Sequence, residues 1–444
     1  MTNIPKEKTL DSSVKLLLEG FPFLQRRFRK FNSDIFETRL LLQKVVCLHG
    51  PEGAALFYDN EYFKRNGAVP KRVQKTLTGE NALHTMDDAA HRHRKEMFMS
   101  VMSQESIKRL LDLMAAQWQA YTLEWETMDR VVLFDEVREI MCRGACAWTG
   151  VPLKESEVSK RADDFVARVD AFGAVGPRHW RGRFARIRSE KWIARIIEQV
   201  RNGELQVQEG TPAHTVAWHR DLNGELLDQH MAAVELINLI RPIVAIARYI
   251  TFSALALHQF PVYRQRILAG EENYVEYFVQ EVRRYYPFAP FLGARARSDF
   301  EWQGYEFEEG QLVLLDVYGT LHDERLWERP TAFSPERFKY WKGSKFDFIP
   351  QGGGDYDSGH RCAGEWITIE VMKQAVAFLT EAIEYRVPNQ DLHYSLRRMP
   401  TYPKSGFVIS NVRRTGKLPA AFASVPPAAS HAATAAPQRC PFLG

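Results

Sequence analysis

One cysteine of this chain follows a glycine-rich loop and precedes a helix-forming pattern. The loop runs from Phe348 to Trp366 and delivers Cys362 to the predicted start of that helix. The positive end of a helix dipole and nearby backbone N–H groups favour a thiolate. Glycines such as Gly354 let the backbone approach the sulfur and a flat cofactor. These features suit a thiolate ligand of heme iron, although a lone cysteine is more often a buried, inert residue.

A second residue that could do chemistry is an arginine inside an apolar segment. The most apolar long stretch runs from Met231 to Leu257 and contains Arg241, which is followed by Pro242. A buried guanidinium is costly without a partner anion, and it can form a bidentate pair with a carboxylate. The partner is either an Asp or Glu of the chain or the carboxylate of a bound substrate. Pro242 removes a backbone hydrogen bond, so we expect it to kink the helix.

The elements that must position these residues are mainly helices. Helical periodicity covers the long apolar segment and the stretches 101–125, 133–148, 158–172, 186–202, 274–286 and 363–385. Strand-like alternation is confined to 40–48, 54–59, 299–307, 311–316 and 406–412. Charged residues punctuate the apolar segment, so we expect a buried helix of about 40 Å rather than a membrane span. The pattern predicts a mainly α protein with a minor β portion.

The chain is predicted to form one catalytic domain followed by a tail. No linker composition interrupts residues 10–410, so a single domain is assigned to residues 1–412. Residues 413–444 are rich in Pro and Ala without periodicity, which predicts disorder. No flavin site is expected after Val412, and so no fused reductase.

Composition and charge exclude some classes of protein. The chain has 444 residues, of which 45% are apolar and 26% charged, and can therefore bury a core large enough to enclose a cofactor. The net charge is only +4, which gives no reason to expect nucleic acid as a partner. The basic run from Arg178 to Arg188 is expected to be a solvated face.

The cysteines indicate a reducing compartment. Their number, five, is odd, and the first ten residues are polar and lack the apolar stretch of a signal peptide. We therefore expect a cytoplasmic protein without a disulfide framework. Cys142 and Cys146 are spaced i, i+4, but no His or Cys pair completes a zinc site nearby, so we expect them to be core residues. Cys440 lies on the predicted tail and is expected to be unimportant.

Two further motifs accompany the cysteine loop in a fixed order. Glu281 and Arg284 form a Glu-x-x-Arg pair on one helix face, and Arg337 follows in a Pro-Glu-Arg-Phe segment. In this order the motifs resemble those of the heme-thiolate cytochromes of the P-450 superfamily, over residues 10–412. The long Gln-Gly-Gly-Gly loop before Cys362 resembles the fatty-acid peroxygenase branch in particular. That branch includes bacterial fatty-acid α- and β-hydroxylases and an alkene-forming decarboxylase.

The resemblance implies a fold, a cofactor and a reaction. The fold would place heme b between the long central helix and the loop of Cys362, the iron ligand. Oxygen-activating members of the superfamily carry an acid–alcohol pair where this chain has Arg241 and Pro242. The resemblance implies that a fatty-acid carboxylate pairs with Arg241 and acts as the general base and acid that splits hydrogen peroxide. Fatty acid and hydrogen peroxide would then be the partners, and no reductase would be required.

The segment ending at His84 lies over the heme in this family. The hydroxylases commonly carry Gln at the position of His84, whereas the decarboxylase carries His. An imidazole there could donate a proton, although most histidines are structural. Thr78 stands where the decarboxylase has a Phe that orients its histidine. The resemblance therefore implies mainly hydroxy acids, with some terminal alkene.

Other matching positions concern the cofactor and the alkyl chain. His91 and Lys95 resemble a family element that meets a heme propionate, and Arg295 matches another propionate partner; all three could equally be exposed cations. Four positions resemble the residues of the family's alkyl channel, with ordinary core packing as the alternative: Leu77, Val169, Phe288 and Phe291.

The sequence thus predicts a peroxide-driven fatty-acid hydroxylase acting at the α or β carbon. Clamping the carboxylate at Arg241 would leave only the nearest carbons within reach of the oxidant. Two alternatives stay open. One is a monooxygenase fed by a reductase, and the other is a heme-containing lipid-binding or sensor protein without turnover.

Overall fold

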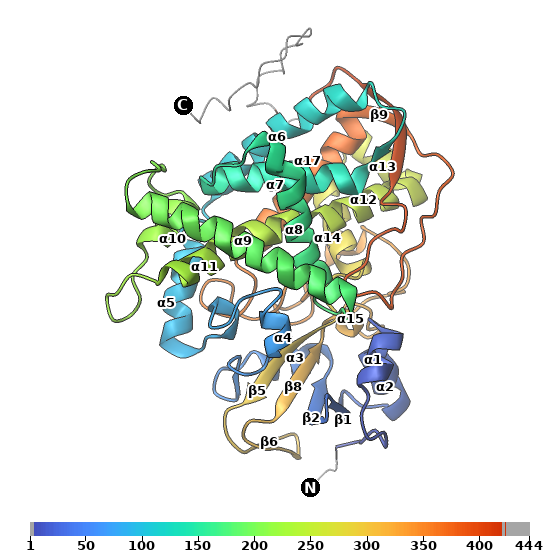
Figure 1. Cartoon of the computed structure of the whole chain (residues 1–444). Coiled ribbons are helices and arrows are strands. Elements are labelled where there is room, and N and C mark those ends of the chain that lie inside the picture. Colours follow the sequence, from blue (N-terminus) through green and yellow to red (C-terminus); the bar gives the residue numbers. More distant parts are fainter. Residues whose placement is uncertain (1–3, 420–421, 423–444) are drawn as a thin grey trace.

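Helices form most of the molecule and gather on one side of a smaller β region (Figure 1). The computed structural model describes residues 4–419 and 422. The helices are α1 Ser13–Glu19, α2 Phe23–Phe31, α3 Gly50–Phe57, α4 Lys71–Gln74, α5 Asp88–Met99, α6 Gln104–Trp125, α7 Leu133–Thr149, α8 Val158–Asp170, α9 Pro177–Arg201, α10 Pro212–Trp218, α11 Gln229–Ala245, α12 Ala247–Gln259, α13 Pro261–Leu268, α14 Tyr274–Tyr285, α15 Val317–Thr320, α16 Arg337–Tyr340 and α17 Glu365–Ala377. The prediction of a mainly α protein is confirmed.

The strands form one larger sheet and two small ones. They are β1 Ile35–Leu40, β2 Gln43–Leu48, β3 Phe63–Lys64, β4 Val131–Val132, β5 Phe291–Ala296, β6 Phe300–Trp302, β7 Tyr305–Phe307, β8 Leu312–Asp316, β9 Ile383–Arg386 and β10 Val408–Arg414. The five-stranded sheet has the order β1-β2-β8-β5-β3, in which only β2 and β8 run parallel. The second sheet has three strands in the order β4-β10-β9, and β6 and β7 form the third.

Several predicted elements differ from the structure, and three of them show why. Residues 54–59, predicted as a strand, belong mostly to helix α3, because Pro51 starts a helix and a short apolar run does not distinguish the two states. Helix α9 begins at Pro177, nine residues before the predicted start, again with a proline in its first turn. The predicted helix 363–385 divides into α17, a π-helical turn over Phe378–Ala382 and strand β9.

The long apolar segment forms two consecutive helices inside the protein. Asp228 caps α11 by accepting a hydrogen bond from the backbone N–H of Met231. The helix continues through Pro242 to Ala245, and α12 begins at Ala247. The segment Gln229–Gln259 is long and apolar enough to cross a membrane, but 83% of its most apolar window is buried inside the protein. The predicted burial of the segment is therefore confirmed, but the segment forms two helices rather than the one long helix predicted.

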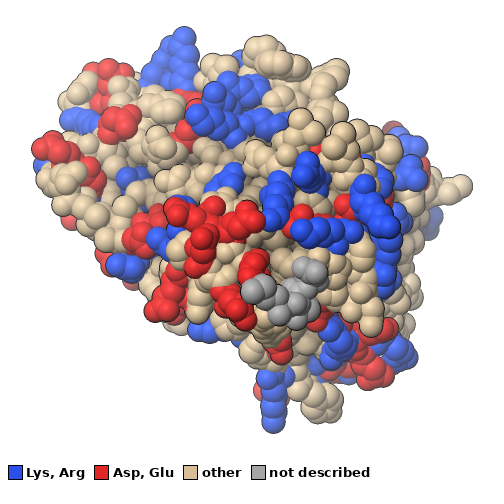
Figure 2. Space-filling model, turned by 90° about the horizontal axis from the view of Figure 1, so that it is seen from below, with Lys and Arg blue, Asp and Glu red and all other residues tan. Residues whose placement is uncertain are grey.

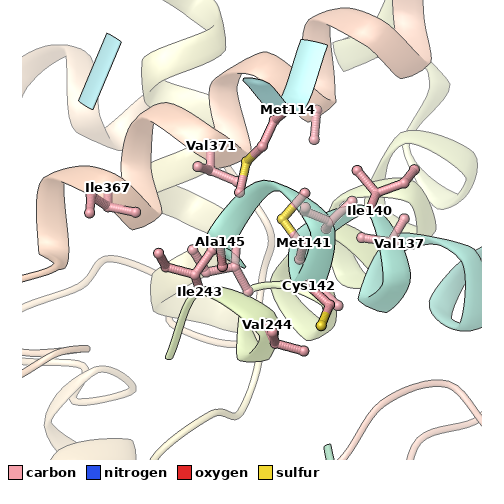
Figure 3. Close-up of a cluster of buried hydrophobic side chains, with 14 of the residues drawn as sticks. Met114, Val137, Ile140, Met141, Cys142, Ala145, Ile243, Val244, Ile367 and Val371 are labelled. Carbon is pink, nitrogen blue, oxygen red and sulfur yellow. The ribbon is translucent and has the colours of Figure 1, made fainter. Parts of the chain in front are cut away.

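Helix α11 packs against α7 in the main apolar cluster. Figure 3 shows Ile243 and Val244 of α11 beside Ala145 and Cys142 of α7, with α17 above them. Cys142 and Cys146 are both almost fully buried, so their prediction as core residues is confirmed. This packing fixes the helix that carries Arg241.

The surface carries charges of both signs. Figure 2 shows basic and acidic side chains interspersed over the face seen from below. The basic run Arg178–Arg188 lies on α9, and its prediction as a solvated face is wrong in part. Arg186 is buried and donates a hydrogen bond to the carbonyl of Gln74, because α9 packs over that segment of the chain.

The predicted boundary of the tail falls inside a strand. Strand β10 continues to Arg414, two residues beyond the predicted end of the domain. Most of the predicted tail, including Cys440, lies in residues 420–421 and 423–444, outside the described residues.

Candidate active site

The glycine-rich loop holds Cys362 close to the start of α17. The backbone N–H of Cys362 donates to the carbonyl of Gln351 over 3.1 Å, and the Gln351 side-chain amide approaches the sulfur at 3.7 Å. Gly354 has a φ of 80°, and a Cβ added there would lie 3.3 Å from the Tyr58 Cβ. The loop therefore requires glycine at this position, as predicted for a backbone that packs closely.

Burial, rather than the helix start, dominates the acidity of Cys362. Burial and the Glu365 carboxylate raise the pKa of the thiol above its ordinary value, although the Gly364 N–H and Lys95 oppose them. The predicted help from the backbone near the helix start is therefore present at the Gly364 N–H, but burial outweighs it. A metal ion bound to the sulfur would reverse the balance, because a coordinating thiol is deprotonated.

Four basic side chains form a buried cluster around the Cys362 loop, which we call the basic cluster: Arg65, His91, Lys95 and His360. The rings of His91 and His360 lie 3.8 Å apart, centroid to centroid. Lys95 donates to the carbonyl of Arg361 over 2.5 Å. Residues predicted from sequence and residues missed there thus meet in one place.

The Asp87 carboxylate lies 3.8 Å from Nε2 of His360, but burial outweighs its effect on the pKa values of His91 and Arg65. Burial together with Lys95 lowers the pKa of His91 to about 4. Burial also lowers the pKa of Arg65 to about 10, with a smaller contribution from Arg297. The Arg65 Nη1 atom is buried without a hydrogen-bond partner, while Nη2 donates to the carbonyl of Phe57. A ligand that brings negative charge would relieve both the repulsion and the unpaired donor.

These residues fit heme b. The group carries two propionates for the basic cluster and an iron for the sulfur of Cys362. Cys362 would ligate the iron, and Arg65, His91, Lys95 and His360 would hold the propionate side.

Arg295 lies outside the basic cluster. Its guanidinium donates to the carbonyls of Gly67 and Gly310 and to the side chain of Gln43. It lines an open surface pocket of about 800 Å³ together with Arg297. Its predicted role as a propionate partner therefore finds no support in these contacts.

Arg241 is a buried cation without an acidic partner. The residue is 7% exposed, and within residues 4–419 and 422 no Asp or Glu forms an ion pair with it. Its Nε atom has no hydrogen-bond partner. Burial, together with the nearby Arg186, lowers its pKa to about 10. The alternative of a salt bridge within the described chain is thereby excluded.

His84 lies near enough to Arg241 to be affected by its charge. The residue is open to water, yet burial among protein atoms lowers the pKa of its ring to about 3, with Arg241 as the next cause. Arg241 also interacts electrostatically with Cys362. His84, Arg241 and Cys362 therefore lie near one another, and His84 is neutral at physiological pH.

Helix α11 ties the His84 segment to Arg241. Glu235 accepts hydrogen bonds from the backbone N–H of Leu83 over 2.9 Å and from Arg94 over 2.8 Å. Asn238, three residues before Arg241, donates to the carbonyl of Thr78 over 2.8 Å and to Glu235 over 3.1 Å. All these groups are buried, so the position of the segment is fixed by side chains of one helix.

The four predicted channel residues divide into two groups. Leu77 and Val169 belong to none of the three apolar clusters of the described residues, so ordinary packing in those clusters does not account for them. Phe288 stacks on Tyr249, with ring centroids 4.5 Å apart. Phe291 packs instead against the cluster between α2 and the larger sheet.

The Glu-x-x-Arg motif forms the predicted structural pair. Arg284 contacts both carboxylate oxygens of Glu281 at 2.7 Å, and Arg337 approaches the same carboxylate at 3.1 Å. Arg284 also donates to the carbonyls of Leu321, Pro330 and Ala332. The three residues join α14 to the segment that leads to the cysteine loop.

Sequence reasoning missed four residues near the site, for different reasons. His360 stands two positions before Cys362, so its place in the loop was a usable signal. Arg65, Arg168 and Asn238 carried no signal, because the carbonyls of Phe57, Thr76 and Thr78 to which they donate lie at least eight positions away along the chain.

Comparison with known proteins identifies the family. A family model described as cytochrome P-450 matches residues 271–407. The solved structure of Cytochrome P450EX alpha (CYP152N1) with myristic acid is 46% identical, with a TM-score of 0.91, and the match covers 94% of this chain and all of that one. The chain belongs to the cytochrome P-450 family. This P-450 is a heme-thiolate oxidoreductase, and the predicted fold is confirmed.

Two further comparisons place the chain more finely. A variant of cytochrome P-450 OleT, solved with arachidonic acid, is 38% identical with a TM-score of 0.91, and the match again covers 94% of this chain and all of that one. Psoralen synthase from Ammi majus is 31% identical over 122 residues, which are 26% of this chain but only 24% of that protein. The likeness to fatty-acid-bound structures thus extends over nearly the whole chain, whereas the likeness to the plant enzyme is local.

Proposed function

We propose that this P-450 hydroxylates long-chain fatty acids at the α or β carbon with hydrogen peroxide, without a reductase, in the cytoplasm. A single catalytic domain over residues 1–412 would do so. The observation that carries the proposal is the buried Arg241 without an acidic partner in the described chain. The similar structures that were solved with myristic and arachidonic acid support a carboxylate as the missing anion.

The bound carboxylate supplies the acid–base group that α11 lacks. The guanidinium of Arg241 can hold both carboxylate oxygens in a bidentate pair. The held carboxylate takes the proton from one oxygen of hydrogen peroxide and returns it to the other. Pro242, at the next position, leaves no side-chain alcohol or acid to do this. The substrate therefore completes the catalytic apparatus.

The pair between Arg241 and the substrate carboxylate also explains which carbons would be oxidised. Heme, when bound, supplies the redox chemistry, and the thiolate of Cys362 donates electron density that favours cleavage of the O–O bond. A carboxylate fixed at Arg241 leaves only the adjacent carbons within reach. Leu77, Val169 and Phe288 would contact the alkyl chain beyond them.

His84 acts as a neutral hydrogen-bonding group in this proposal. Its pKa of about 3 excludes a charged imidazolium at physiological pH in the ligand-free protein. Thr78 offers no ring to orient the imidazole. We therefore expect hydroxy acids as main products and terminal alkene as a minor one.

The test is incubation of the heme-loaded protein with a long-chain saturated fatty acid and hydrogen peroxide, without reductase, followed by mass spectrometry. Hydroxy acids or terminal alkenes are expected. Product formed only with a reductase and dioxygen would identify a conventional monooxygenase. No product under either condition, with an intact heme-thiolate spectrum, would indicate a lipid-binding or sensor protein.

A further inference from the structure

Five consecutive backbone carbonyls, those of residues 74–78, each accept a hydrogen bond from a side chain of α8, α9 or α11. Arg186 donates to Gln74, Arg183 to Lys75, Arg168 to both Thr76 and Leu77, and Asn238 to Thr78. We call these four side chains the carbonyl clamp. In Figure 1 the segment follows the short helix α4, which lies below α8 and α9.

The clamp replaces the backbone partners that this segment lacks. Helix α4 ends at Gln74, and the last carbonyls of a helix have no partner within it. Gln74 also accepts from the N–H of Gly79, but in the described chain no backbone N–H reaches the next four carbonyls. Buried carbonyls need a partner, so side chains must supply it.

Arg168 is the central member of the clamp. Its side chain is wholly buried, with Nε 3.3 Å from the carbonyl of Thr76 and Nη2 3.1 Å from that of Leu77. Among the described residues no Asp or Glu forms an ion pair with it, and Arg186 and Arg241 lie near enough to repel it. A wholly buried arginine with no acidic partner is costly, so its two carbonyl contacts are its evident role.

The clamped segment adjoins residues of the candidate active site, since Arg168 lies near Arg241 and Asn238 is bonded to Thr78. Leu77 lies outside the apolar clusters, and Thr78 is followed within six residues by His84. Arg168 precedes Val169 on α8, and Asn238 precedes Arg241 by one helical turn. The clamp therefore connects three of the elements that would surround the first carbons of a bound fatty acid.

We propose that Arg168 and Asn238 are positioning residues: they fix the backbone of residues 76–78 so that Leu77 and Thr78 confine the first carbons of the substrate, and thereby select the carbon that is oxidised. The selection of a carbon rests on the proposed function. The fixation of the segment does not.

The test compares Arg168→Lys with a matched control, Arg201→Lys. Lysine keeps the positive charge but cannot span two carbonyls. Arg201, at the end of α9, also holds two backbone carbonyls: its Nε lies 2.9 Å from that of Ala217 and its Nη2 lies 2.7 Å from that of Leu227. Neither carbonyl belongs to the segment 74–78. Amide hydrogen exchange of the peptide covering residues 74–85 and the ratio of α-hydroxy, β-hydroxy and alkene products are measured for both.

Arg168→Lys is expected to speed exchange in the 74–85 peptide and to change the product ratio about threefold, the scale of one lost hydrogen bond. Heme content and the heme-thiolate spectrum should stay at the wild-type level. Arg201→Lys should change neither the exchange of this peptide nor the ratio. If Arg168→Lys does not fold, Asn238→Leu removes the donor to Thr78 at similar volume and takes its place.

The outcomes separate the parts of the proposal. Faster exchange with an unchanged product ratio would overturn the selection of a carbon, and unchanged exchange would overturn the clamp itself. A ratio that changes equally in Arg201→Lys would show a general effect of destabilisation and would also overturn it. A wild type that forms no product would overturn the proposed function and the selection with it, while the exchange measurement still decides on the clamp.

Discussion

Buried cations of the sheet region and of the α11 site differ in their partners. His49, between β2 and α3, lies between two carboxylates, with Nδ1 3.2 Å from Asp316 and Nε2 3.2 Å from Asp323. Arg241 has no such carboxylate in the described chain. A buried charge that the chain itself pairs or hydrogen-bonds contributes to the fold, whereas one with neither a carboxylate nor a carbonyl partner in the described chain points to a ligand.

The same contrast holds between Arg241 and Arg284. Arg284 is fully buried. Its guanidinium donates two hydrogen bonds to the Glu281 carboxylate and further hydrogen bonds to three backbone carbonyls. Both arginines are charged and buried, so residue type and burial do not distinguish them. The partners do, and they predict opposite consequences of substitution.

The largest effect is expected from removing the paired cation. Arg284→Ala leaves the Glu281 carboxylate buried without its main partner, which typically costs about 3–5 kcal/mol of the free energy of unfolding. Urea unfolding and heme content check this. A variant as stable as the wild type would show that the Glu281–Arg284 pair does not stabilise the fold.

Removing the unpaired cation is expected to act on turnover instead. Arg241→Ala should lower kcat/KM for fatty acids about a hundredfold, the scale of a lost charge-assisted bidentate contact, with heme retained and stability unchanged or raised. Arg201→Ala is the matched control on α9. Undiminished turnover in Arg241→Ala would contradict the substrate-assisted mechanism.

His49 is expected to make stability depend on pH. Burial lowers its pKa, but Asp316 and Asp323 outweigh it and raise the value from 6.5 to about 9. Because the folded pKa is the higher one, this stabilisation is fully present below pH 6.5 and is lost as the pH rises through about 9. The difference in unfolding free energy between wild type and His49→Gln should shrink by about 3 kcal/mol across that window. A constant difference would contradict the pairing.

The smallest effect is expected at His84, which carries no charge to lose. His84→Gln keeps a neutral hydrogen-bonding group at the same place, so total turnover should change less than about threefold. The alkene fraction should fall, as mass spectrometry of the products would show. An unaltered product ratio would exclude a steering role for the imidazole.

Much of the frame of the site could be predicted from sequence, and its partners could not. The glycine loop and Cys362 are neighbours in the chain, and Glu281 and Arg284 share one helix face. Local pattern was therefore enough to predict both features. The opposing effect of burial on the Cys362 thiol could not be predicted, because burial depends on packing that no local pattern contains. Arg186 was predicted to lie on a solvated face, but the packing of α9 buries it against the carbonyl of Gln74.

Sequence by itself determined that this chain is mainly helical, that a single cysteine stands at the end of a glycine-rich loop, and that an arginine and a proline interrupt the apolar central helix. These are properties of neighbouring residues. Tertiary structure decided that Arg65 and His360 join the basic cluster, that Arg241 meets no carboxylate of the described chain, and that Arg168 holds the carbonyls of Thr76 and Leu77. Each of these facts joins residues far apart in the chain, and only folding brings their charges and donors within bonding distance.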